Sequence, residues 1–170
     1  MIDQSSIRAY AGRADIRKSE RIVEEAHQAG KQTAFLSHSH KDAELAKGLQ
    51  GFLQAQGWSV YIDWEDTSMP SRPNRNTAQN IKDRIKRFDW FLFLATANSA
   101  SSRWCPWEIG YADGVKHIDK IVIVPTRDSS GHNHGNEYLD LYRHVDAAQV
   151  GGYGLFQPNN RGMLLENVTS

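Results

Sequence analysis

The sequence contains a single cysteine, Cys105, among its 170 residues. One thiol can form neither an intramolecular disulfide framework nor a cysteine-based zinc cluster, so both are excluded. So little cysteine is typical of proteins from a reducing compartment. We therefore expect a cytoplasmic protein.

An excess of charge of one sign is also absent, because 20 lysines and arginines balance 20 aspartates and glutamates. Nonspecific nucleic-acid binding would require a basic excess. No stretch approaches the roughly 18 consecutive apolar residues of a membrane span, and the first residues lack the pattern of a signal peptide. We expect neither nucleic acid nor a membrane among the partners.

What the sequence does contain is an alternation of short apolar segments with helical ones. The segments predicted as strands are 33–37, 58–63, 90–95 and 121–125. Helical periodicity lies between them, and the unbroken apolar run 90–95 is typical of a strand covered on both faces. With right-handed crossovers, this order predicts an α/β fold with an open parallel, flavodoxin-like sheet of about five strands and helices on both faces.

The flanks of this pattern are less regular. We predict three parts: an N-terminal helical extension (1–30), the α/β domain (31–150) and an irregular C-terminal segment (151–170). The fifth strand has no clear signal after residue 127. The polar residues 98–102 predict a turn, and residues 64–76, with two prolines, predict a long loop.

Polar residues follow the predicted strands where an open parallel sheet binds ligands, at the carboxyl ends of its strands. Ser37, His38 and Ser39 follow the first strand, and Asp63 and Trp64 lie at the end of the second. After the third strand, Trp104 and Glu108 are spaced i, i+4, which places both on one face of a helix. These residues are the candidate site.

The same residues carry a family resemblance. The stretch Phe35 to Asp42 (FLSHSHKD), the strand Val60 to Asp63 before a proline-containing loop, and the Trp104-xxx-Glu108 motif together resemble a bacterial TIR (Toll/interleukin-1 receptor) domain. The similarity covers roughly residues 33–125. It extends to standalone TIR proteins of Thoeris antiphage defence.

The resemblance implies an NAD+ nucleosidase that releases nicotinamide and makes ADP-ribose or a cyclic ADP-ribose signal. NAD+ would be the substrate, and no cofactor is implied. No metal is expected either, because no carboxylate or cysteine set accompanies the pairs His38/His40 and His132/His134. Glu108 would be the catalytic carboxylate, and Ser37, His38, Ser39, Asp63, Trp64 and Trp104 would bind the substrate. The resemblance also implies TIR–TIR self-association through the loop 65–76, which includes Arg72 and Arg75, and a downstream effector that senses the product.

The chemistry agrees with a single carboxylate. Departure of nicotinamide builds positive charge on the ribose, and a carboxylate beside the ring stabilises that oxocarbenium-like transition state. Nicotinamide leaves as a neutral molecule, so no second acid is needed. We expect the Glu108 carboxylate to point into a crevice open to the dinucleotide.

Alternatives remain open for most of these residues. In the alternative interpretation, Glu108 is only a helix-terminal acid, Trp104 and Trp64 are only packing aromatics, and Ser39 is only a helix cap. The chain would then be a non-catalytic TIR interaction module acting by homotypic assembly. A nucleoside deoxyribosyltransferase-like enzyme is a minor alternative. A response-regulator receiver is excluded, because Ala95 stands where its third strand needs an aspartate.

Overall fold

The computed structural model describes residues 1–13, 24–26, 28–29, 31–63, 75–159 and 161–168. Five parallel strands form its centre: β2 (Thr33–Ser37), β3 (Ser59–Ile62), β4 (Trp90–Ala95), β5 (Ile121–Arg127) and β7 (Arg143–Ala147). Their order across the sheet is β3-β2-β4-β5-β7. The predicted open, flavodoxin-like sheet is thus confirmed, and β7 is the fifth strand that the sequence left unplaced.

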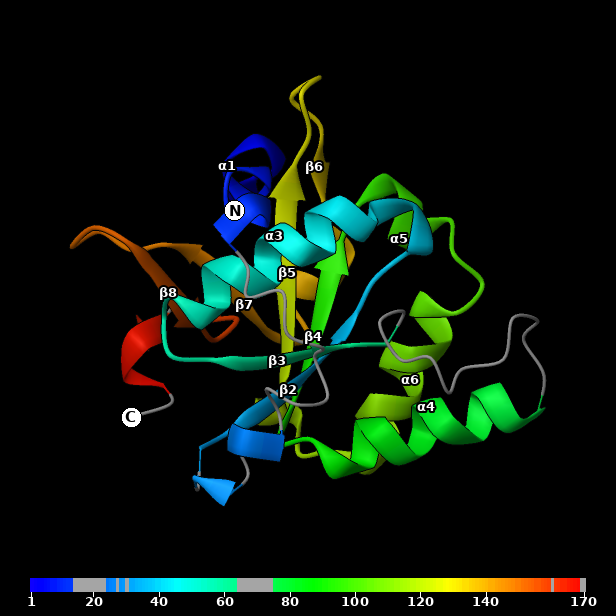
Figure 1. Cartoon of the computed structure of the whole chain (residues 1–170). Coiled ribbons are helices and arrows are strands. Elements are labelled where there is room, and N and C mark those ends of the chain that lie inside the picture. The colour runs from blue at the N-terminus through cyan, green and yellow to red at the C-terminus, as the bar shows by residue number, and fades with distance from the viewer. Residues whose placement is uncertain (14–23, 27, 30, 64–74, 160, 169–170) are drawn as a thin grey trace.

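Helices cover both faces of this sheet (Figure 1). The short helix α1 (Gln4–Arg8) and the longer α3 (Ala43–Gln54) lie on one face, and α4 (Arg75–Arg87) and α6 (Cys105–Val115) lie on the other. Successive side chains of a strand point to opposite faces. In β2, Leu36 therefore packs in the core on the α3 side, whereas Phe35 packs on the α4 and α6 side.

Local sequence signals set the ends of the helices beside the site. The Ser39 hydroxyl accepts a hydrogen bond from the Lys41 N–H (3.4 Å) and caps the short 3-10 helix η2 (His40–Asp42), which leads into α3. Pro106 lies in the first turn of α6, where its missing N–H costs no hydrogen bond. The Ser102 hydroxyl accepts from the N–H groups of Trp104 and Cys105 and so caps this turn.

The first residues are built into the same core. The strand β1 (Ile2–Asp3) pairs in parallel with β5, and α1 packs directly against α3. The approach is so close that a Cβ on Gly48 of α3 would lie 2.3 Å from the carbonyl oxygen of Ile7. The helical extension expected over residues 1–30 therefore also contributes a strand and buried side chains.

Two expectations about local structure were wrong. Residues 97–100 form the helix α5 (Ala97–Ala100), because Thr96 and Ser99 make a reciprocal capping box. The C-terminal segment expected to be irregular instead contains two antiparallel strands, β8 (Tyr153–Phe156) and β9 (Gly162–Leu164). Their shortness and glycines hid the strand period.

Smaller elements complete the described chain: η1 (Ala11–Arg13), η4 (Ile118–Lys120), β6 (Asn133–His134), α7 (Asn136–Leu139) and η5 (Leu165–Asn167). The β6 strand pairs with the end of β5, and this hairpin projects beyond the body of the sheet (Figure 1). Among the described helices, none has the length and apolar character that a membrane crossing would need.

Candidate active site

The candidate residues meet at the carboxyl ends of the central strands. Ser37 is the last residue of β2, and Asp63 directly follows β3, its neighbour in the sheet. Between β2 and β4 the strand order reverses, because the chain leaves β2 toward β3 and returns to β4 on the other side. In open α/β sheets this reversal opens a crevice that binds ligands.

Glu108 reaches this point from α6. It lies one helical turn after Trp104, whose carbonyl oxygen accepts a hydrogen bond from the Glu108 N–H. The Ser37 hydroxyl donates to Glu108 Oε2 at 2.6 Å. The structure thus joins the Trp104-xxx-Glu108 motif of α6 to the end of β2, 71 residues earlier in the sequence.

The expectation that the Glu108 carboxylate faces an open crevice was wrong, because its residue is only 3% exposed. The cause is its position on the helix. Glu108 is three residues after Cys105 and four before Ala112, and both of these are buried against the sheet. It therefore lies on the inward face of α6, closed off from solvent.

Burial sets the protonation of this carboxyl group. Removal from water and, to a lesser degree, the nearby negative charge of Asp63 raise the pKa of Glu108, whereas the hydrogen bond from Ser37 lowers it. The net effect brings this pKa to about 8. In the free protein the group is therefore mostly protonated at neutral pH. A cation placed beside it would favour its ionised form.

His38 is the second buried titratable group. Its Nδ1 lies 3.2 Å from the Leu36 carbonyl oxygen and 3.8 Å from Asp63 Oδ1. Burial lowers the pKa of His38, while the charge of Asp63 opposes that shift. Because a carbonyl can only accept, Nδ1 carries the hydrogen, and Nε2 has no hydrogen-bond partner within the described chain.

The remaining predicted site residues differ in their surroundings, and two of them lie outside the described part of the chain. Trp104 is half-buried and packs edge-on against Trp107, with ring centroids 5.3 Å apart. Trp107 in turn stacks on Tyr111. Contact of Trp104 with substrate stays a prediction. Arg75 begins α4 and is exposed, whereas Trp64 and Arg72 lie outside the described residues.

Two further buried residues near these strand ends, Asp42 and Cys105, were not predicted to be site residues. Burial raises the pKa of the Cys105 thiol to about 12, which disfavours the thiolate form that a nucleophile needs. The Asp42 carboxylate accepts hydrogen bonds from Thr96 Oγ1 (2.6 Å) and Asn98 Nδ2 (2.7 Å). Asp42 is 54 and 56 residues from Thr96 and Asn98 in the sequence, so only the fold brings these three residues together.

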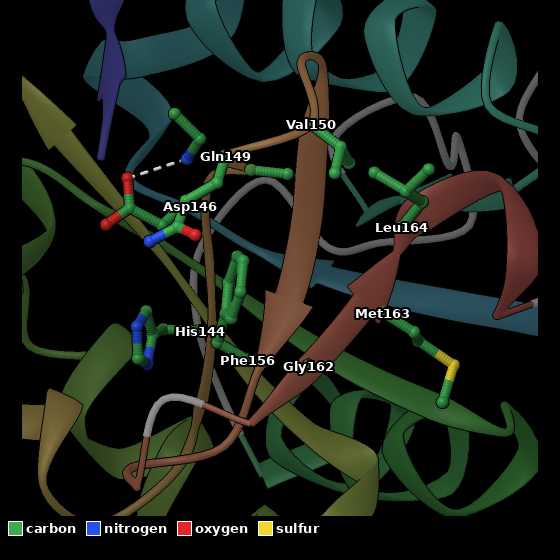
Figure 2. A pocket seen from close by; sticks show the side chains of 10 residues that line it. His144, Asp146, Gln149, Val150, Phe156, Gly162, Met163 and Leu164 are labelled. Carbon is green, nitrogen blue, oxygen red and sulfur yellow. Dashed lines mark hydrogen bonds between the residues drawn. The ribbon is translucent and has the colours of Figure 1, made fainter.

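A hollow of about 550 Å³ lies elsewhere, over the hairpin β7–β8 and strand β9. Figure 2 shows the His144 and Phe156 rings side by side in it, with centroids 6.1 Å apart, and Val150 on the turn above. None of the predicted site residues lines this hollow. The Phe156 ring lies close over Gly154 and Gly162, where a Cβ on either glycine would meet it.

The fold and this arrangement define an open α/β domain with a buried carboxylate at the reversal of its strand order. The TIR domain family model matches residues 34–152, which include every predicted site residue. The chain belongs to the TIR domain family.

Two relatives are similar over part of their length. A protein of Bacillus cereus (strain MSX-D12) named "Probable 3' cyclic ADP-D-ribose synthase ThsB'" is 40% identical over 115 residues, 65% of this chain and 58% of its own length. One of Cytobacillus dafuensis named "Putative cyclic ADP-D-ribose synthase TIR2" is 31% identical over 81 residues, 46% of this chain and 21% of its own length. The matched regions thus span less than two thirds of either relative.

Proposed function

We propose that this protein is a TIR enzyme that cleaves NAD+, releases nicotinamide and makes a cyclic ADP-ribose or ADP-ribose signal in antiphage defence. The observation that carries the proposal is the position of Glu108, held by Ser37 at the carboxyl end of β2. The names of the two relatives support the same chemistry.

The electrostatics of the site suit a cationic substrate. NAD+ presents a positively charged nicotinamide ring, and cleavage moves positive charge onto the ribose as the C–N bond breaks. Next to Glu108 and Asp63, either cation favours ionisation of Glu108, whose pKa is raised to about 8. Binding of substrate would therefore generate the carboxylate that stabilises the transition state.

The acceptor of the ADP-ribosyl group decides the product. Attack by water gives ADP-ribose, and attack by a hydroxyl or ring nitrogen of the same molecule gives a cyclic isomer. We propose the cyclic product, because both relatives are named synthases of it. Mass spectrometry of the reaction mixture distinguishes the two, since the cyclic product is lighter by one water.

The decisive experiment measures nicotinamide release from NAD+ by the purified protein and by Glu108→Gln. The amide keeps the shape and can still accept from Ser37, but it cannot carry negative charge. We expect a loss of at least about 100-fold in kcat. Glu137→Gln, the same change at an exposed residue of α7, is the matched control and should keep wild-type turnover.

A second candidate function is a non-catalytic module that acts by homotypic assembly. The burial of Glu108 favours it, because a sealed carboxylate cannot touch substrate in this conformation. Assembly could also be the event that opens an active site. If concentrated and self-associated protein releases no nicotinamide, the enzyme proposal fails and the assembly module remains.

We also propose a cytoplasmic location, self-association, and an effector that senses the product. A purified effector should respond to the wild-type reaction mixture and not to that of Glu108→Gln. Sedimentation at increasing protein concentration tests self-association directly.

A further inference from the structure

Asp42 carries a buried carboxylate without an ion-pair partner in the described part of the chain. Its residue is 7% exposed. A buried charge is costly unless hydrogen bonds compensate it. Here both oxygens are used, since Oδ2 accepts from Thr96 and Oδ1 accepts from Asn98.

These bonds connect the two loops that border the strand reversal. Asp42 ends η2, five residues after Ser37, in the loop that leaves β2. Thr96 and Asn98 belong to the loop and helix that follow β4, the strand paired with β2. One carboxylate thus ties together the two sides of the proposed substrate crevice.

The segment that Asp42 contacts, after β4, continues through α5 into α6, the helix that carries Glu108. Helix α5 contacts α6. The Ser102 hydroxyl, just after α5, caps the turn from which α6 starts. From there α6 carries Glu108 back to Ser37. The segment that contains α5 and α6 is therefore joined to the end of β2 and the loop after it at two points. One is the pair of hydrogen bonds to Asp42, and the other is the Ser37–Glu108 hydrogen bond.

We propose that Asp42 is a positioning residue, which through Thr96 and Asn98 holds α5 against the loop after β2 and thereby fixes Glu108 on Ser37. The inference rests on the proposed function, because it assigns Asp42 to the same site. Asp42 acts through other residues and is not proposed to touch the substrate.

A series of variants separates the effect of the Asp42 hydrogen bonds to Thr96 and Asn98 from the effect of its negative charge. Asp42→Ala removes both acceptors. Asp42→Asn can keep both hydrogen bonds, because its oxygen can accept from Thr96 and its N–H₂ can donate to Asn98 once the Asn98 amide is flipped. Asn98→Ala, at a half-buried position, removes one bond and keeps the charge. Asp140→Ala is the control at an exposed aspartate.

Two readouts follow each variant: kcat and KM for nicotinamide release, and the pH midpoint of Glu108. The pH midpoint is measured by NMR, from the ¹³C chemical shift of the Glu108 side-chain carboxyl carbon as a function of pH. The signal is assigned because it is absent from the spectrum of Glu108→Gln. This measurement requires no enzymatic turnover. The groups that act on Glu108 are Asp63 after β3 and Ser37 at the end of β2, with Cys105 on its own helix. None of them changes in the series.

We expect Asp42→Ala to lower kcat by about 10- to 100-fold with little change in KM, because small displacements of a catalytic group cost rates of that order. Its Glu108 midpoint should fall, since a loosened helix admits water. Asn98→Ala should show smaller shifts in the same direction. Asp42→Asn should keep both properties near the wild-type values, within about threefold in kcat.

Two results would overturn the proposal: a folded Asp42→Ala or Asn98→Ala with wild-type kcat and wild-type Glu108 midpoint, or an Asp42→Asn as impaired as Asp42→Ala. The first denies positioning, and the second assigns the effect to charge. If Asp42→Ala does not fold, the comparison of Asn98→Ala with Asp42→Asn decides. If the wild type releases no nicotinamide, the proposed function fails while the Glu108 midpoints still decide on the tie.

Discussion

The protonation of Glu108 gives the proposed enzyme a specific pH dependence. If only the ionised carboxylate stabilises the ribosyl cation, kcat/KM for NAD+ should rise with pH and level off above the pKa of about 8. Initial rates of nicotinamide release from about pH 6 to about pH 10 measure this profile. A profile that is flat through this range would show that Glu108 does not control the rate.

The same group links stability to pH. Its pKa is raised from 4.5 to about 8, so the folded chain holds a proton that the unfolded chain releases between these values. The free energy of unfolding should therefore fall by a few kcal/mol as pH rises from about 4.5 to about 8. Urea unfolding of Glu108→Gln should lack this part of the decrease, whereas Glu137→Gln should retain it.

Ser37 provides a test of the hydrogen bond itself. Its hydroxyl lowers the pKa of Glu108, so Ser37→Ala should raise that pKa further. Activity at neutral pH should drop and recover at higher pH. A pH profile measured beside that of Ser101→Ala, whose hydroxyl contacts only the Ala97 carbonyl among the described residues, provides the comparison. An unshifted profile would contradict the role given to Ser37.

At the scale of elements, the close contact of α1 with α3 makes an unusual demand on Gly48. A Cβ there would lie 2.3 Å from the Ile7 carbonyl oxygen, so Gly48→Ala should lower the free energy of unfolding by about 1–3 kcal/mol. Gly110 in α6 has open space at its Cβ position, and Gly110→Ala should raise the same quantity by about 0.5–1 kcal/mol. Chemical denaturation measures the free energy of unfolding of both variants. Equal changes in Gly48→Ala and Gly110→Ala would contradict the close contact between Gly48 and Ile7.

The elements best predicted from sequence were those with a strong local signal. The run Trp90–Ala95 and the amphipathic α3 and α4 were found because apolar periodicity is visible in the residues themselves. β7, β8 and β9 were missed because their own patterns are short and glycines interrupt β8 and begin β9. The site divides in the same way: the motif indicated Glu108, but its burial depends on how α6 packs on β2, and the Asp42 contacts depend on two loops far apart in sequence.

For the whole molecule, the C-terminal strands are part of the core. Leu155 and Leu165 are 3% and 1% exposed, and the Trp58 indole N–H donates to the Leu165 carbonyl oxygen. Removal of residues 151–170 would expose that core and leave the indole without this acceptor. Each fully buried leucine contributes about 1.5–3 kcal/mol, a large part of ordinary domain stability.

The truncated chain ending at residue 150 should therefore be unfolded or strongly destabilised. Thermal unfolding followed by circular dichroism, together with limited proteolysis of the same chain, measures the effect. An exposed-site change such as Met163→Ala in β9 is the control and should unfold near the wild-type temperature. Cooperative unfolding of the truncated chain at the wild-type temperature would show that the last strands are dispensable.

The buried thiol of Cys105 provides a natural probe for conformational opening around α6. It is the only cysteine in the chain, and it lies one helical turn before Glu108 on the same inward face. A thiol reagent can label it only when that face of α6 becomes accessible. The labelling rate under native conditions would therefore report, without any engineered reporter, how often the face of α6 that carries Glu108 is uncovered. Measured with and without NAD+, and at increasing protein concentration, it would test whether the proposed substrate or self-association makes this opening more frequent.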